Sequence, residues 1–118
     1  PVFAVAPWKG PGEPVMLPPA SATVVGSDRL AHLRVKDPHV SDFHCLIATH
    51  PVEDGRAPVL VDLRSDSGTF VKRMPVHRKR LRPKHILSIG RSHFVVRRAG
   101  EVGPPAIASP SRADVPVR

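Results

Sequence analysis

Residues 62–71 read DLRSDSGTFV and place a polar loop between two short β-strands. The residues just before the loop, 59–63, are β-branched and aliphatic, and residues 69–71 return to a strand-like composition after a cluster of turn formers. Ser65, Ser67 and Thr69 offer hydroxyl groups, and Gly68 permits a backbone angle that a residue with a Cβ resists. A loop mounted in this way on strands is typical of a site that holds a polar ligand.

The chain as a whole predicts one all-β domain. Its 118 residues can bury one modest core, and its 15 prolines and 8 glycines separate short apolar runs that show no long stripe at helical spacing. Roughly ten such runs up to residue 96 indicate a two-sheet antiparallel sandwich. In the run at residues 58–63 we expect Val59, Val61 and Leu63 to share one face.

Residues 99–118 have a different composition. They are rich in Pro, Ala, Ser and Gly with isolated Val, and such a segment cannot bury enough apolar surface to fold alone. We therefore expect residues 1–98 to form the domain and residues 99–118 to form an extended tail. Such a tail is expected to become ordered against a partner, as in a component of a larger assembly.

The sequence offers no catalytic or metal site. Ser41, Asp42 and His44 are too close along an extended chain to converge as a triad, and no G-x-S-x-G motif is present. The seven histidines lack the paired spacing of a zinc site, and Cys45 lies beside apolar residues as a buried cysteine does. We expect no enzyme activity, no metal and no cofactor.

The same sequence gives a prediction for the compartment. No apolar run approaches the roughly 20 residues that span a bilayer, and the first residues lack a secretory signal. A single cysteine excludes an internal disulfide. We therefore expect an intracellular protein, mitochondrial or nuclear, with no membrane partner.

Positive charge is concentrated in residues 72–85, KRMPVHRKRLRPKH. The net charge of the chain is +8, and this segment has seven cations and no acid, which leaves about +1 (8 minus 7) for the rest. Such a patch is typical of a protein that binds RNA or another polyanion. Only Phe70 and Phe94 lie near it, so we expect contact with the phosphate backbone without base stacking. We also expect the segment to interrupt the strand pattern until Ile86. The seven cations are Lys72, Arg73, Arg78, Lys79, Arg80, Arg82 and Lys84.

Taken in order, these motifs resemble the forkhead-associated (FHA) domain. Gly26 corresponds to the G of a G-R pair, residues 40–44 (VSDFH) to an S-x-x-H motif, residues 62–71 to D-L-x-S-x-N-G-T-F-V, and residues 81–90 to L-x-x-G-D-x-I-x-I-G. The resemblance covers about residues 1–98. It implies an FHA-like antiparallel β-sandwich of the SMAD/FHA type, with about eleven short strands and no catalysis, whose loops at one end bind a phosphothreonine peptide.

The resemblance also implies roles for individual residues. It places Ser41 at the serine whose hydroxyl contacts the phosphate, and it makes three residues structural supports of the loops, namely Gly26, His44 and Gly68. The phosphopeptide site that it implies consists of Ser41, Ser65, Ser67, Thr69 and, two positions after Ser27, Arg29.

Two departures from the family pattern weaken this expectation, because Ser27 replaces the phosphate-binding Arg and Ser67 replaces the Asn that holds the peptide backbone. A third departure, Lys84 and His85 in place of an acidic Gly-Asp turn, adds to the basic segment and favours an anionic partner. Two functions remain open. One is an interaction module that binds a protein partner, with phosphothreonine recognition weakened. The other is a structural subunit of a large ribonucleoprotein, such as a mitochondrial ribosome, that contacts RNA through residues 72–85. A weaker third reading is a nuclear adaptor that binds DNA or an acidic phosphorylated tail.

Overall fold

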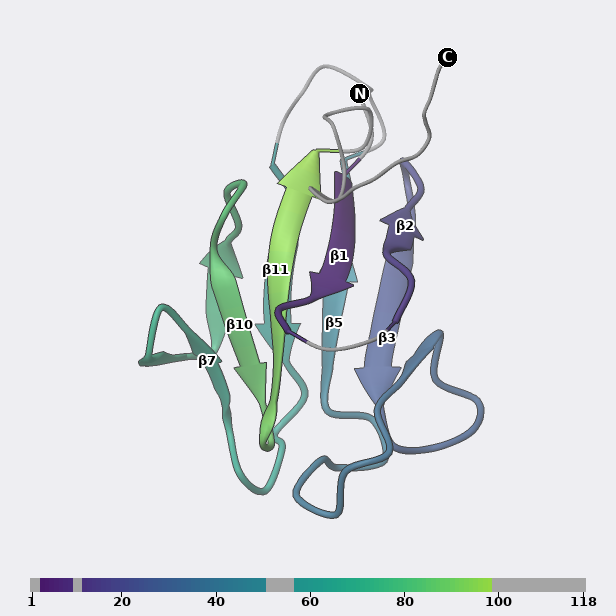
Figure 1. Cartoon of the computed structure of the whole chain (residues 1–118), viewed down its shortest axis with the longest axis vertical. Helices are drawn as coiled ribbons and strands as arrows, with labels where there is room; N and C mark the ends of the chain where they lie inside the picture. Colours follow the sequence, from purple (N-terminus) through teal and green to yellow (C-terminus); the bar gives the residue numbers. More distant parts are fainter. Residues whose placement is uncertain (1–2, 10–11, 51–56, 99–118) are drawn as a thin grey trace.

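The computed structural model describes residues 3–9, 12–50 and 57–98, and the tail expected at residues 99–118 lies outside them. The described residues form eleven β-strands in two sheets (Figure 1). No helix in this part of the chain is long and apolar enough to cross a membrane. The expected all-β sandwich is confirmed.

Each sheet has its own set of strands. The six-stranded sheet has the order β2-β1-β11-β10-β7-β8 and consists of β1 (Phe3–Pro7), β2 (Val15–Leu17), β7 (Thr69–Val71), β8 (Met74–Val76), β10 (Ile86–Ile89) and β11 (Ser92–Arg98). The five-stranded sheet has the order β4-β3-β5-β6-β9 and consists of β3 (Ala22–Gly26), β4 (Leu33–Arg34), β5 (Cys45–Ala48), β6 (Val59–Asp62) and β9 (Arg78–Arg80). Neighbouring strands pair antiparallel in both sheets, except for β3 and β4 of the five-stranded sheet, which run parallel.

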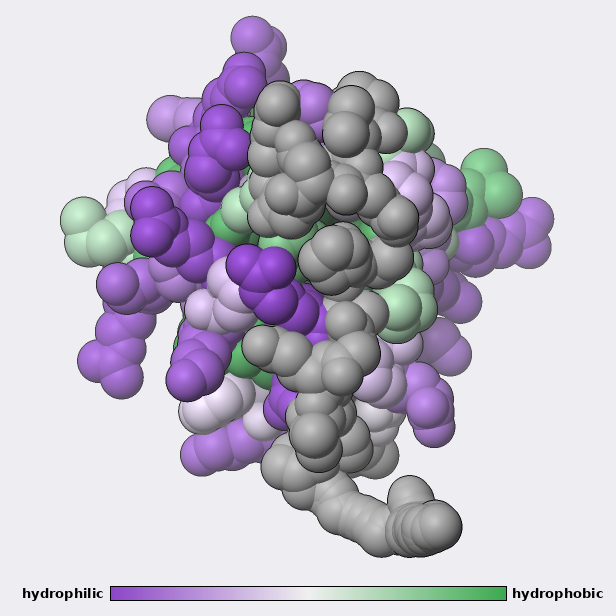
Figure 2. All heavy atoms as spheres, turned by 90° about the horizontal axis from the view of Figure 1, so that it is seen from above, coloured by the Kyte–Doolittle hydropathy of each residue, from purple (hydrophilic) through white to green (hydrophobic). Residues whose placement is uncertain are grey.

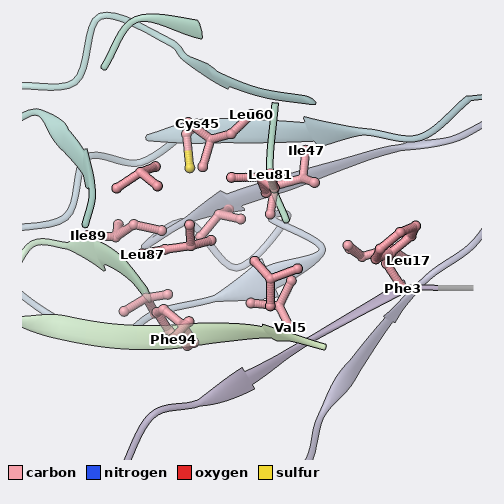
Figure 3. Packing of buried hydrophobic residues seen from close by; sticks show 14 of the residues in the cluster. Phe3, Val5, Leu17, Cys45, Ile47, Leu60, Leu81, Leu87, Ile89 and Phe94 are labelled. Carbon is pink, nitrogen blue, oxygen red and sulfur yellow. The ribbon is translucent and has the colours of Figure 1, made fainter. Parts of the chain in front are cut away.

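The core lies between the two sheets. Val5 and Leu87 of the six-stranded sheet face Ile47 and Leu60 of the other, and Leu81 fills the space between them (Figure 3). All five are at most 1% exposed, which is the burial that drives such a sandwich to form. In β6 the buried residue is Leu60, while Val59 and Val61, which were expected to share one face, are only partly buried.

The basic segment contributes two strands, although it was expected to interrupt the pattern. β8 forms an edge of the six-stranded sheet, and β9 forms an edge of the five-stranded sheet beside β6. Cationic side chains and a proline on edge strands prevent pairing with another chain. The RKR sequence of β9 and the Pro75 of β8 therefore have a structural reason of their own.

Candidate functional site

Four loops meet at one end of the sandwich, at the bottom of Figure 1. They are residues 27–32, 35–44, 63–68 and 90–91, and we call their meeting place the loop end. Hydrogen bonds between separate loops hold this end together, as the following contacts show.

His44 joins two of these loops from the inside. Its side chain is fully buried; its Nδ1 accepts a hydrogen bond from the backbone N–H of Ser41 at 3.0 Å, and its Nε2 lies 2.8 Å from the carbonyl oxygen of Gly68. Because Nδ1 is the acceptor, the ring hydrogen lies on Nε2 and is donated to Gly68. This geometry supports the structural role that the resemblance implied for His44.

Two glycines shape the same end. A Cβ on Gly26 would lie 1.9 Å from the backbone oxygen of Asp42, so this position requires a residue without a side chain. Gly68 has a φ of +86°, a conformation that residues with a side chain rarely adopt. Gly26 therefore lets the backbone of residue 42 come close, and Gly68 supplies the left-handed turn before β7.

Asp37 ties the 35–44 loop to the turn between β10 and β11. Its carboxylate accepts hydrogen bonds from the backbone N–H groups of His39 and Arg91, each at 2.8 Å, and from the hydroxyl of Ser92 at 3.1 Å. The bond from His39, together with those from Arg91 and Ser92, lowers the pKa of Asp37 in spite of its partial burial.

Asp62 organises the loop that follows β6. Its carboxylate accepts hydrogen bonds from the Ser65 hydroxyl at 2.5 Å, the Thr69 hydroxyl at 2.7 Å and the Ser65 backbone N–H at 3.2 Å. Burial alone would raise the pKa of Asp62, but these hydrogen bonds bring it below its ordinary value. Thr69 is 1% exposed, so it supports the loop from below and does not face a ligand.

The hydroxyl groups of the expected phosphopeptide site are not equally available. Ser65 donates its hydrogen to Asp62, and Ser67 donates its hydrogen to the carbonyl oxygen of His39 at 2.7 Å. The Ser41 hydroxyl accepts a hydrogen bond from the backbone N–H of Asp66 at 3.0 Å, and its own hydrogen has no acceptor among the described residues. Ser41 is therefore the hydroxyl best placed to donate to an incoming anion.

A guanidinium group that the sequence did not single out lies near this serine. Arg34, on β4, donates from Nε to the carbonyl oxygen of Ser27 at 3.1 Å, and the N–H of Ser27 donates to the carbonyl oxygen of Ser41 at 3.0 Å. Arg29, the residue expected from sequence, is exposed and has no hydrogen bond to the described part of the chain. The parallel pairing of β3 with β4, which brings Arg34 beside the end of β3, was not visible in the sequence pattern.

A carboxylate also lies at this point. Asp42 is exposed directly after Ser41, and one of its oxygens accepts a hydrogen bond from the Ser27 hydroxyl at 3.3 Å. Because like charges repel, Asp42 opposes the binding of a phosphate at Ser41. This effect of Asp42 was not predicted from the sequence.

A shallow pocket of about 500 Å³ lies next to these loops. Its walls come from Asp62, from residues 64–70 and from residues 75–77 at the end of β8. Arg64, with a φ of +57°, and Asp66 also line it. A pocket of this kind gives an extended peptide room to lie beside the loop.

The cations of the basic segment lie at the edges of both sheets, on the β7–β8 turn, on β9 and just after it. Lys72 and Arg73 form the turn between β7 and β8, and Figure 2 shows strongly hydrophilic side chains projecting on the left, the side on which β7 lies in Figure 1. Three of these cations act together on the imidazole of His85. Burial lowers its pKa first, and the positive charges of Lys72, Lys79 and Arg82 lower it further.

The described residues contain no group of three or more His, Cys, Asp or Glu side chains that could hold a metal ion. Cys45 is fully buried, and burial raises the pKa of its thiol to about 12. A thiol in this state is not a nucleophile at neutral pH.

Comparisons with known proteins agree with this geometry. A sequence profile of the FHA domain matches residues 23–90, more than half of the chain. No curated protein sequence matches this chain.

Solved FHA domains have the same fold. One, from a structural and functional analysis of phosphothreonine-dependent FHA domain interactions, is 28% identical with a TM-score of 0.74, over 83% of this chain and 97% of that one. The FhaA FHA domain, solved in complex with the intracellular domain of Rv3910, is 27% identical with a TM-score of 0.73, over 80% and 99% of the two chains. The FHA domain of the CT664 protein from Chlamydia trachomatis shares the fold at 21% identity and a TM-score of 0.76, over 83% and 98%. The chain belongs to the FHA domain family.

Proposed function

We propose that this chain is a non-enzymatic interaction module whose loop end binds a protein partner phosphorylated on threonine. The observation that carries the proposal is the Ser41 hydroxyl, which is fixed by the N–H of Asp66 and has its own hydrogen available. His44 holds the Ser41 backbone from behind, so the hydroxyl is positioned before any ligand arrives.

The relatives support a partner of this chemistry. FHA domains are generally phosphothreonine-dependent interaction modules, and one similar structure comes from work on such interactions. Another similar domain was solved with the intracellular domain of a second protein. Two exposed apolar side chains on the loops, Leu30 at 76% and Phe43 at 46%, offer additional contact area for a partner.

The same site predicts weak binding. Ser27 supplies a neutral hydroxyl where the family pattern has a guanidinium, and that hydroxyl already donates to Asp42. Ser67 is likewise engaged with the carbonyl oxygen of His39. Asp42 adds a negative charge next to Ser41. Each of these features lowers the affinity for a phosphate.

Arg34 is the cation that compensates in part. Its guanidinium donates a hydrogen bond to the carbonyl oxygen of Ser27, and the N–H of Ser27 in turn donates to the carbonyl oxygen of Ser41. Nε is engaged there, and the two terminal nitrogens of the guanidinium retain donors for a phosphate oxygen. We therefore assign the phosphate-binding cation to Arg34 and not to Arg29.

The test is a fluorescence anisotropy titration with a library of phosphothreonine peptides and their unphosphorylated counterparts. Ser41→Ala should weaken the best peptide roughly tenfold or more, because it removes a hydrogen bond to a charged group. Ser21→Ala, which changes a serine outside the loop end, is the matched control and should bind as the parent does. If no library member binds better when phosphorylated, phosphothreonine recognition is ruled out.

Two further experiments test which arginine binds the phosphate and whether Asp42 weakens the binding. Arg34→Gln should weaken binding while Arg29→Gln leaves it unchanged, and the opposite order would contradict the assignment. Ser27→Arg combined with Asp42→Asn restores the guanidinium of the family pattern and removes the repelling carboxylate. This double variant should bind the same peptide roughly tenfold tighter or more.

A second candidate function is contact with RNA or another polyanion through residues 72–85. The concentration of seven cations without an acid in this segment favours it. Burial is the main cause of the lowered pKa of His85, and the charges of Lys72, Lys79 and Arg82 add to it. The affinity for a single-stranded RNA should fall log-linearly with salt, and neutralising Arg78, Lys79 and Arg80 should make the slope shallower by about 2. A flat salt dependence contradicts this function. A place in a large ribonucleoprotein such as a mitochondrial ribosome, and with it the compartment, depends on the same result.

A further inference from the structure

The outer face of the six-stranded sheet has a hollow of about 530 Å³, lined by residues from four separate parts of the chain. Because Leu87 and Ile89 face the core, the alternate residues Ile86 and Ser88 of β10 point outward and form its floor. This face is turned towards the viewer in Figure 1. Known small-molecule sites have volumes on the order of 300–1,000 Å³, so the hollow is large enough for a ligand. Its lining consists of Trp8, Lys9, Lys72, Arg73, Ile86, Ser88 and His93.

The polar part of the lining is suited to an anion. Lys9, Lys72 and Arg73 contribute three positive charges, and no carboxylate lines the hollow. His93 is fixed on the floor by a 2.9 Å hydrogen bond between its Nδ1 and the Ser88 hydroxyl. Its Nε2 has no partner among the described residues, which leaves it able to contact a ligand.

The aromatic part of the lining was not expected from sequence. Phe70 and Phe94 are the aromatic residues near the basic segment in the chain, and base stacking was therefore not expected. The structure brings Trp8 into the same hollow as Lys72 and Arg73, and its indole is 48% exposed. An exposed indole with cations beside it is the combination that binds a base and its phosphate.

The two cations at the rim occupy a costly backbone conformation. Lys72 and Arg73 have φ values of +53° and +69° and form the two-residue turn between β7 and β8. Hairpin turns with positive φ at both positions favour Asn-Gly, because side chains with a Cβ are strained there. Strain of this kind persists mainly at functional positions. The chain thus keeps two cations where stability alone would favour other residues.

We propose that this hollow binds a nucleotide, with the base against Trp8 and the phosphate against Lys72, Arg73 and Lys9. The nucleotide is either a free nucleoside phosphate or one unit of a single-stranded RNA. This site lies on a sheet face and not at the loop end, so the proposal stands apart from phosphothreonine binding. It deepens the RNA contact proposed above by naming the residues that would bind one nucleotide.

Trp8 makes the test specific, because it is the only tryptophan in the chain. Adenosine monophosphate, an adenosine hexanucleotide of RNA, inorganic phosphate and polyglutamate are each titrated while the Trp8 fluorescence is recorded. We expect at least one of the two nucleotide probes to quench the indole fluorescence. The probe that does so at the lower concentration shows whether the natural ligand is a free nucleoside phosphate or a single-stranded RNA. Inorganic phosphate and polyglutamate should leave the fluorescence nearly unchanged.

Lys72→Asn combined with Arg73→Gly is the decisive variant. It installs the favoured Asn-Gly turn and removes two charges, so it should raise the melting temperature while weakening nucleotide binding roughly tenfold or more. A loss of binding in a more stable protein cannot be ascribed to unfolding. Arg29→Gln combined with Lys36→Gln is the matched control, because it removes two charges from exposed loop positions that lie outside both the hollow and residues 72–85. It should quench as the parent does.

Three results would overturn the nucleotide site. One is the absence of quenching by either nucleotide probe at millimolar concentration. Another is equal quenching by polyglutamate, which would indicate an acidic polypeptide as the occupant. The third is weaker binding in a Lys79→Gln, Arg80→Gln variant of β9 with no loss in the variant of residues 72–73. That third result would reject the hollow but leave the broader polyanion contact standing, so the two proposals can fail separately.

Discussion

Replacing His44 with alanine should damage both the stability of the domain and its loop end. The imidazole is fully buried and bridges the N–H of Ser41 and the carbonyl oxygen of Gly68, at 3.0 and 2.8 Å. Alanine removes both hydrogen bonds and leaves both backbone groups without a protein partner. The two loops that present Ser41 and Gly68 then lose their shared support.

The expected size follows from these contacts. Each buried polar group left unsatisfied costs about 1–3 kcal/mol, so the two groups together cost about 2–6 kcal/mol. Water can reach part of this end, which favours the middle of that range, about 3–4 kcal/mol. Because domains of this size are stable by about 5–15 kcal/mol, His44→Ala should remain folded but with a clearly lower denaturation midpoint.

Urea denaturation followed by circular dichroism measures this loss. His93→Ala is the matched control, because the side chain of His93 is exposed and makes one hydrogen bond, to the Ser88 hydroxyl. The control should lose about 1 kcal/mol or less. If His44→Ala loses no more than His93→Ala, the bridging role of His44 is refuted. The phosphothreonine peptide should also bind more weakly to His44→Ala, although Ser41 is still present.

Three other changes test the scaffold. Gly26→Ala should cost about 3 kcal/mol or more in thermal melts, since its Cβ would lie 1.9 Å from the backbone oxygen of Asp42; a melt like that of the parent contradicts this close approach. Because the pKa of Asp62 lies below 3.8, its ionised form stabilises the fold above about pH 4, and that contribution is lost as the pH falls through the lowered pKa. Asp62→Asn should therefore be less stable at pH 7 and show a smaller loss on acidification, and equal acid sensitivity would refute this. Cys45, with a thiol pKa of about 12, should react with a thiol reagent at pH 8 only as fast as the domain opens, and rapid labelling of the folded protein would contradict its burial.

The fold could be predicted because its signals are local. Two short motifs carry these signals, the turn formers of residues 62–71 and the S-x-x-H motif at Ser41 and His44. The structure places both motifs at one end of the sandwich, as the resemblance implied. The resemblance implied a structural role for Gly26, and the backbone oxygen of Asp42 lies where its Cβ would be.

The errors arise where a distant part of the chain decides the outcome. Alternation was expected along β6, and it is the opposite sheet that decides that the face with Leu60 meets the core. The RKR strand β9 has no apolar alternation and exists because β6 offers it a pairing partner. Trp8 and Arg34 were missed because strand pairing alone brings them to the outer face and to the loop end.

The most direct test of the proposed function is a map of the peptide contact in solution. Backbone amide signals of the isotopically labelled protein are recorded while the best phosphothreonine peptide of the library is added. We expect the amide signals of Ser41 and Asp66 to shift first and most, and those of β1, β10 and β11 to stay in place. Shifts confined to the six-stranded sheet, or equal shifts with the unphosphorylated peptide, would contradict it.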